Sequence, residues 1–413
     1  MRIRTLTHGT LLFSGMLLTA APLLRAEAQD VDVPGNLTMH DSTDPSVGNV
    51  LKEGVPFLHN FGTNNTFLGS GAGNFAMTGS ENTANGTGAL FANDTGGANT
   101  ATGFGALGSN TTGDSNTAIG HSALSSNTTG YHNTASGYNA LTDNTTGWGN
   151  AASGWAALSS NTTGQENTGS GYNALTNNTT GFDNTATGGF ALYGNTTGGN
   201  NTATGQAALA GNTTGDSNTA IGVAALQRNT TGFGNTSIGD SADVSVGNLF
   251  NATAIGFNAR VNASNKIRLG NTEVTVIEGQ VPYTYTSDRN EKENFRAVEA
   301  EAVLTKLRGL SVTSWNYKGQ DAKQFRHYGP VAQDFFAAFG RDAVGTIGTP
   351  TTITSGDLDG ILMIAAQALE KRMVEQKKEI NALIVENVDL KARLEALERL
   401  VGNRVACAEA STQ

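Results

Sequence analysis

The sequence predicts a mostly β protein, in which a β-solenoid of 17-residue repeats is followed by a small α+β domain and a long C-terminal coiled-coil helix. A 17-residue unit recurs in phase through the middle of the chain. Glycine accounts for 53 of the 413 residues and charged residues for only 15%, which is too few for amphipathic helices over most of the length. Apolar heptads occupy the last part of the chain.

The chain begins with the pattern of a secretory signal peptide. Arg2 and Arg4 precede an apolar run from Leu11 to Leu24, and Ala26–Ala28 has the small-residue pattern of a cleavage site. The mature chain should therefore begin near Gln29. An N-terminal membrane anchor is the alternative, although the apolar run is short for a span. No second long apolar stretch follows, so we expect a secreted or cell-surface protein.

The repeat reads N-T-A-x-G-x-x-A-L-x-x-N-T-T-G-x-x and contains two asparagines at fixed positions. Seventeen residues are too few for two helices, and glycine and asparagine in every copy disfavour helix. We expect each copy to form one coil of a solenoid. The first asparagine recurs at Asn65, Asn82, Asn99, Asn116, Asn133, Asn150, Asn167, Asn184, Asn201, Asn218 and Asn235, and the second recurs in step from Asn93 to Asn229.

One copy illustrates the expected coil. Two short strands, Thr117–Ile119 and Ser122–Leu124, should alternate with tight turns at Gly120 and Gly130, where glycine permits a positive φ. The side chain of Asn127 can cap its turn. Stacking places identical positions above one another, so asparagine should bond to asparagine while Ala, Ile and Leu fill a thin interior.

These repeats resemble the heads of trimeric autotransporter adhesins, whose N-x-x-x-I-G units build a left-handed parallel β-roll. The resemblance extends from about Asn64 to Gly279, and Asn251–Gly270 fits the shorter spacing of the adhesin units best. It implies that three chains pack together, which would cover the apolar face of so thin a coil.

Aromatic residues recur in two columns after repeat glycines. They could form a carbohydrate-binding strip, but stacking at a subunit contact or a turn is the interpretation that we favour. The first column contains Phe104, Tyr138, Trp155 and Tyr172, and the second contains Tyr131, Trp148, Phe182 and Phe233.

Other chemistries have little support in the sequence. His121 and His132 lack carboxylate partners at ligand spacing, so no metal and no cofactor is expected. The acidic residues Asp114, Glu166, Asp183 and Asp216 read as solvated turn residues without a fixed glycosidase pair. A formal net charge of −10 argues against a nucleic-acid partner. The single cysteine, Cys407, rules out an intrachain disulfide.

Helical patterns begin after Gly279. We expect a helix around Val303–Leu307, a strand at Val312–Tyr317, a helix at Ala332–Phe339 and a long helix from about Asp357. The long helix could pack on its own domain, but its heptads suit a parallel bundle. The a positions are Ala366, Met373, Ile380, Asn387, Leu394 and Val401, and the d positions are Leu369, Gln376, Leu383, Leu390 and Leu397.

The segment T-S-D-R-N-E-K, which ends at Lys292, resembles the start of the intramolecular chaperone auto-processing domain of phage endosialidases, tail spikes and tail fibres. The resemblance extends to about Leu400. It implies a serine nucleophile at Ser287, a lysine general base at Lys292 and a scissile bond between Thr286 and Ser287. The supporting motif of that family corresponds here to His327, Gly329 and Gln333.

We therefore expect a secreted trimeric fibre or adhesin-like stalk, whose C-terminal chaperone trimerises the chain and cleaves itself once, in cis, before Ser287. Its partner would be its own copies, with a cell-surface glycan or receptor as a further possibility. The alternative is a carbohydrate-binding module or a tail-fibre-like receptor-binding protein with a retained, non-cleaving trimerisation domain. At the residue level, Ser287 could instead only cap a helix.

The expected organisation follows these changes in composition. In chain order the parts are a signal peptide (1–28), a lead-in or cap (29–63), the solenoid (64–279), a linker with the cleavage site (280–286), the auto-processing domain (287–356), the coiled-coil helix (357–402) and a tail (403–413).

Overall fold

The computed structural model describes residues 41–45, 47–274, 277, 287–318, 320–342 and 345–410, without the side chains of 405–410. The predicted signal peptide and Thr286 lie outside the described residues. The chain divides into two compact units, with the boundary between Asn271 and Thr272. Each unit is described by itself below.

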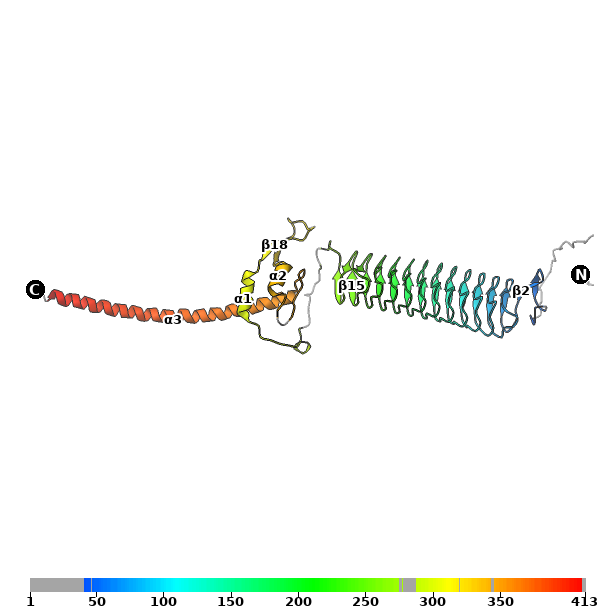
Figure 1. Ribbon diagram of the computed structural model, residues 1–413, viewed down its shortest axis with the longest axis horizontal. Coiled ribbons are helices and arrows are strands. Elements are labelled where there is room, and N and C mark those ends of the chain that lie inside the picture. The colour runs from blue at the N-terminus through cyan, green and yellow to red at the C-terminus, as the bar shows by residue number, and fades with distance from the viewer. Residues whose placement is uncertain are drawn as a thin grey trace, which may run out of the picture. The chain divides into compact units, whose positions relative to one another are not determined.

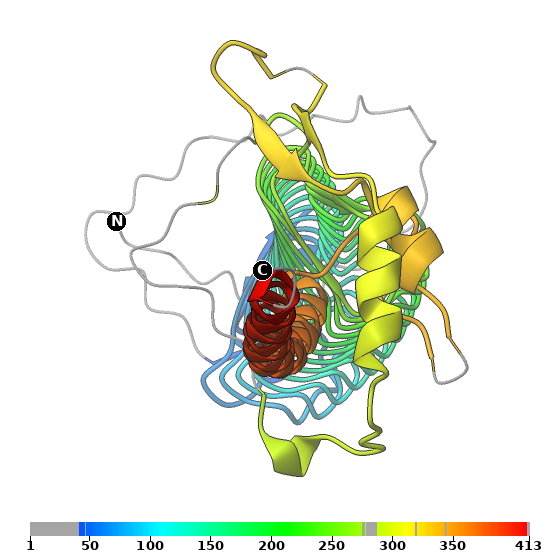
Figure 2. The ribbon, with the colours of Figure 1, turned by 90° about the vertical axis from the view of Figure 1, so that its left-hand side faces the viewer.

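The first unit is a β-solenoid of parallel strands, as the repeat predicts (Figure 1). Each coil contributes a strand that pairs with the residues 17 positions further on, so Thr117 pairs with Thr134 and Ala118 with Ala135. Viewed along the stack, the coils superpose (Figure 2). The main sheet comprises β1 (Val50–Lys52), β2 (Val55–His59), β3 (Thr66–Leu68), β4 (Thr83–Asn85), β5 (Thr100–Thr102), β6 (Thr117–Ile119), β7 (Thr134–Ser136), β8 (Ala151–Ser153), β9 (Thr168–Ser170), β10 (Thr185–Thr187), β11 (Thr202–Thr204), β12 (Thr219–Ile221), β13 (Thr236–Ile238), β15 (Ala252–Ile255) and β17 (Lys266–Leu269).

Each regular coil contains one strand, not the two that we expected. The segment Ser122–Leu124 is a turn, because Ser122 and Leu124 have φ values of 54° and 52°. Left-handed backbone of this kind interrupts a strand and is uncommon for leucine. It nevertheless turns Leu124 into the interior, where this residue is fully buried. A second short pair, β14 (Asp243–Val244) with β16 (Arg260–Val261), forms only in the last coils.

Glycine has two different roles in the coil. Gly120 has a φ of 135°, as predicted for a turn glycine. Gly130 does not have a positive φ, so that prediction was wrong. A Cβ atom at Gly130 would collide with the side-chain oxygen of Asn127 and the carbonyl oxygen of Gly147. Glycine is required there because the neighbouring atoms approach the backbone too closely.

Two asparagine ladders run through the interior. Asn116 donates from Nδ2 to Asn99 Oδ1 at 3.2 Å, and its backbone N–H reaches the same oxygen at 2.9 Å. In the second ladder Asn127 Nδ2 donates to Asn110 Oδ1 at 2.8 Å and to the Gly130 carbonyl at 2.9 Å. These side chains are fully buried, so each amide replaces bonds to water with bonds to the adjacent coil.

Alanine and leucine fill the rest of the interior. Columns that include Ala118, Ala123 and Leu124 are fully buried, whereas Ile119 is exposed, contrary to our expectation for isoleucine. The reason is the alternation of the strand, in which only the central residue points inward. At the N-terminal end, β2 pairs antiparallel with β3 and covers its open edge.

The second unit is a small α+β domain that continues into a long helix, as predicted. It contains the 3₁₀ turn η1 (Arg289–Glu291), α1 (Ala300–Gly309), the antiparallel pair β18 (Thr313–Trp315) and β19 (His327–Gly329), α2 (Ala332–Phe339) and α3 (Ser355–Ala410). Its core is formed by Val303, Phe335, Phe339 and Ile361.

Helix α3 uses one face against its own domain and leaves another face unpartnered. Ala365 and Ala368 are buried, and Arg372 pairs with Glu301 of α1, which lowers the pKa of that carboxyl. The leucine, isoleucine, methionine and valine residues at the predicted heptad positions from Leu369 to Val401 are each at least half exposed. Among the described residues, no helix is long and apolar enough to cross a membrane.

Candidate functional site

The segment that follows the predicted cleavage point folds into a tight turn. The carboxylate of Asp288 caps η1 by accepting a hydrogen bond from the backbone N–H of Asn290 at 2.9 Å. The backbone N–H of Lys292 then donates to the Arg289 carbonyl at 3.3 Å. This turn reverses the chain, so residues five positions apart can meet.

Ser287 and Lys292 are brought together by this turn. Lys292 Nζ donates a hydrogen bond to Ser287 Oγ at 2.7 Å. A hydroxyl with an amine in direct contact is the pair that nucleophilic attack by serine requires. The alternative role for Ser287, as a helix cap, is taken by Asp288 in the structure.

Both side chains of the pair are exposed in the single chain. A lysine acts as a base only in its neutral form, and burial favours that form. The arrangement therefore has the geometry of a nucleophile–base pair without the desolvation that its chemistry requires. Nearby, Arg289 lies over the ring of Phe295 at 4.9 Å, which orders the next part of the segment.

The predicted supporting residues belong to a separate aromatic cluster. The ring of His327 stacks on Trp315 at 4.8 Å, and its Nε2 lies 3.3 Å from Gln320 Oε1. Gln333 and Trp315 line a cavity of about 490 Å³ beside Pro330. Gly329, at the end of β19, has a φ of 156°. Among the described residues, no hydrogen bond or ring contact joins this cluster to the Ser287–Lys292 pair.

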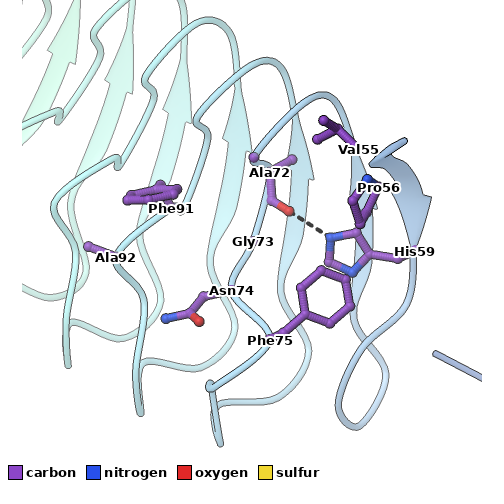
Figure 3. Close-up of a pocket in the computed structure, with 10 residues that line it drawn as sticks. Val55, Pro56, His59, Ala72, Gly73, Asn74, Phe75, Phe91 and Ala92 are labelled. Carbon is purple, nitrogen blue, oxygen red and sulfur yellow. Dashed lines mark hydrogen bonds between the residues drawn. The ribbon is translucent and has the colours of Figure 1, made fainter. Parts of the chain in front are cut away.

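A cavity that we did not predict lies at the N-terminal end of the solenoid. It measures about 440 Å³ and is lined by Val55, Pro56, Phe75 and Phe91, and the buried His59 lies between Pro56 and Phe75 (Figure 3). His59 Nε2 lies 2.8 Å from the Ala72 carbonyl oxygen, and its ring stacks on Phe75 at 4.3 Å. Burial lowers the pKa of His59, although the hydrogen bond to Ala72 opposes this shift. A histidine between apolar residues gives no sequence signal, because its burial depends on how β2 packs on the first coil.

The first aromatic column is a continuous stack. Phe104, His121, Tyr138, Trp155 and Tyr172 follow one another with ring centroids 5.0–6.0 Å apart and interplanar angles of 20° or less. Their ring faces therefore contact each other. A sugar stacks on ring faces, so this arrangement leaves few free faces for a carbohydrate platform.

Two of the four acidic turn residues form hydrogen bonds to the backbone of the solenoid. Asp114 and Asp216 each accept a hydrogen bond at 2.7 Å from the backbone N–H of a glycine in the preceding coil. They are therefore structural as well as solvated. In the part of the chain that the structure describes, no group of His, Cys, Asp or Glu side chains could hold a metal ion.

Comparison with known families gives a match within the C-terminal unit. Residues 287–344 match the model of the family described as "Chaperone of endosialidase". The match begins at Ser287 and includes η1, both short strands and α2. A search of curated proteins found no match. The chain therefore carries, after its β-solenoid, a C-terminal domain similar to the chaperone of endosialidase family, in agreement with the resemblance of its T-S-D-R-N-E-K segment.

Proposed function

We propose that this protein is a secreted trimeric fibre whose C-terminal unit is an intramolecular chaperone that cleaves the chain before Ser287. The observation that carries the proposal is the 2.7 Å contact between Ser287 Oγ and Lys292 Nζ at the first residues of the matched segment. The β-solenoid is the part that would remain as the fibre.

The proposed reaction transfers the Thr286 acyl group and then hydrolyses it. Neutral Lys292 removes the hydroxyl proton as Ser287 Oγ attacks the Thr286 carbonyl carbon. The bond from that carbon to the Ser287 nitrogen breaks, the nitrogen is protonated, and an ester remains. Water hydrolyses the ester, leaving a carboxylate on Thr286 and a free hydroxyl and amine on Ser287. The reaction occurs once, in cis, where attachment supplies a high effective concentration.

Assembly would supply the missing desolvation. The single chain exposes Lys292, and water stabilises its charged form. It also exposes the apolar heptad positions of α3, which a second and third helix would cover. We propose that trimerisation through α3 covers the pair, so that cleavage follows correct assembly.

A trimerising C-terminal domain would also solve a folding problem. Parallel strands pair slowly and expose unpaired edges while they form. Here a coil can pair in any register that is a multiple of 17 residues, because successive coils are nearly identical. Holding three chains together at one end would limit that search.

Intact mass measurement of the purified chain tests the proposal. We expect the wild type to give a fragment ending at Thr286 and one beginning at Ser287. Ser287→Ala and Lys292→Ala should stay full-length, and Lys292→Arg should not restore cleavage because arginine stays protonated. Ser311→Ala and Lys323→Ala, which change exposed residues of the same unit, are the matched controls and should cleave. A wild type that is trimeric but stays intact would leave the domain as a non-cleaving trimerisation cap.

A further inference from the structure

We infer that Asp288 is a positioning residue for cleavage, which keeps Ser287 and Lys292 together by accepting a hydrogen bond from the backbone of the turn between them. This inference rests on the proposed function and adds to it a residue that the reaction needs but that takes no part in bond making. The carboxylate of Asp288 accepts from the N–H of Asn290 at 2.9 Å. Such a bond, from a side chain to the backbone two residues on, forms an Asx turn.

The turn depends on its own hydrogen bonds, because it is not packed into the core of its unit. Residues 287–299 are all exposed, and η1 contains no buried residue. The two backbone bonds that close the turn each measure 3.3 Å, whereas the bond to the Asp288 carboxylate measures 2.9 Å. Since no core packing supports the turn, loss of the side-chain bond should lower the fraction of chains in which the turn is formed.

The turn decides whether the serine and the lysine meet. Lys292 Nζ contacts Ser287 Oγ at 2.7 Å across five positions of the chain. In an extended chain, five residues would separate the two Cα atoms by about 17 Å, which is much further than a lysine side chain reaches. A reaction in cis proceeds in proportion to the fraction of chains whose reacting groups are in place. Asp288 should therefore change the rate of cleavage through the geometry of the pair.

A carboxylate beside a serine–lysine pair could instead act through its charge. In the part of the chain that the structure describes, no ion pair joins Asp288 to Lys292, and the hydrogen bond of Lys292 Nζ goes to Ser287 Oγ. An ion pair would stabilise the protonated lysine and so oppose its action as a base. The carboxylate therefore serves the backbone, and an amide oxygen in the same place should serve equally well.

Positioning and desolvation are separate requirements of the pair. The contact between Ser287 and Lys292 is already formed in the single chain, while both side chains are exposed. Asp288 supplies the positioning within one chain, and assembly through α3 would supply the desolvation. A change at Asp288 should consequently slow cleavage without preventing assembly.

The kinetics of four full chains test the inference: the wild type, Asp288→Ala, Asp288→Asn and Asn290→Ala. Each chain is purified in denaturant and refolded at a pH low enough to keep Lys292 protonated, and sedimentation then shows whether it is a trimer. A rise to different pH values starts cleavage, which intact mass follows with time.

We expect Asp288→Ala to cleave about 2- to 30-fold more slowly at every pH, which corresponds to the loss of a capping side chain. Asp288→Asn should cleave at the wild-type rate, since asparagine also accepts in an Asx turn. Asn290→Ala is the matched control. It keeps the backbone N–H that donates to Asp288, so it should also cleave at the wild-type rate.

The outcomes separate this inference from the proposed function. A wild type that is trimeric but stays intact would overturn both. If the wild type cleaves, an equal rate for Asp288→Ala would overturn the inference alone. An Asp288→Asn chain as slow as Asp288→Ala, or a change in the pH midpoint of the rate, would also overturn it, because the carboxylate would then act through its charge. Failure of Asp288→Ala to form the trimer would overturn it as well, since the residue would then serve assembly.

Discussion

At the scale of single residues, the buried asparagine ladders connect each coil to the next. Asn127 donates to Asn110 and to the Gly130 carbonyl, and its own oxygen accepts from Asn144. An isolated coil could not supply the hydrogen-bond partners of these amides. The asparagine side chains can therefore be buried only when the coils stack. Stability should consequently be shared between neighbouring coils.

Asn127→Ala should destabilise the solenoid strongly. It leaves the Asn110 oxygen without its donor and the Asn144 amide with the Gly147 carbonyl as its remaining acceptor. A buried group left unpaired costs about 1–3 kcal/mol. Thr129→Ala changes an exposed residue two positions away and should have little effect. Denaturant unfolding followed by circular dichroism measures both. Equal midpoints for the two variants would show that the ladder does not contribute to stability.

His59 should make the N-terminal end of the solenoid sensitive to acid. Burial lowers its pKa below the usual 6.5, so the folded state binds fewer protons than the unfolded state. Its contribution to stability is complete above pH 6.5 and is lost as the pH falls through the lowered pKa.

The comparison that tests this is between wild type and His59→Gln, which can still donate to Ala72 but does not titrate. The melting midpoint of the wild type should fall more between pH 7.5 and pH 5 than that of the variant. An equal fall in the melting midpoint of the wild type and of the variant would mean that other groups cause the acid sensitivity.

At the scale of elements, α3 has two faces with different surroundings. Ala365, Ala368 and Arg372 attach it to its own domain, while the heptad positions remain exposed. Packing within one chain thus explains only part of the apolar pattern of α3. Its continuation to Val401, far beyond the domain core, favours association with other helices.

Leu383→Asn with Leu390→Asn should weaken trimer assembly and block cleavage at a distance. Both leucines are d positions and half exposed in the single chain. Val385→Asn with Val388→Asn is the control, since these valines are on the same helix, are more exposed than the leucines and lie off the heptad seam. Sedimentation and intact mass are the measurements. Cleavage at the wild-type rate by a monomeric double-leucine variant would refute the link between assembly and processing.

At the scale of the whole molecule, the two units differ in how strongly their sequences specify their folds. The solenoid buries a thin interior of alanine and leucine between nearly identical coils, which leaves its register weakly specified. The C-terminal unit has its own core and a helix of 56 residues, whose contacts are mostly local and can form quickly. The second unit should therefore assist the first during folding and be dispensable afterwards.

Refolding should depend on the covalent link between the units. After dilution from denaturant, the Ser287→Ala chain should regain β-structure and trimeric sedimentation, whereas the purified cleaved solenoid should not. The native cleaved solenoid, never denatured, is the control and should remain folded. Equal recovery by the cleaved solenoid would show that the C-terminal unit is not needed as a chaperone.

The features that repeat, or that are local, could be predicted from the sequence. The period of 17 residues, the two asparagine ladders and the helical heptads are all visible as spacings, because each depends on regular recurrence along the chain. The Ser287–Lys292 pair is also local, since a capped turn of five residues brings the two side chains together. The family match at residues 287–344 agrees with that segment.

The internal arrangement of each coil could not be predicted from the sequence, because it depends on contacts between coils. Ser122–Leu124 is apolar enough for a strand, yet it turns through left-handed backbone because Leu124 must reach an interior one side chain deep. Ile119 faces outward because the interior beside its strand has room for Ala118 alone. The close approach at Gly130 and the stacking of ring faces depend on atoms 17 residues away, and such through-space contacts have no signature in the local sequence.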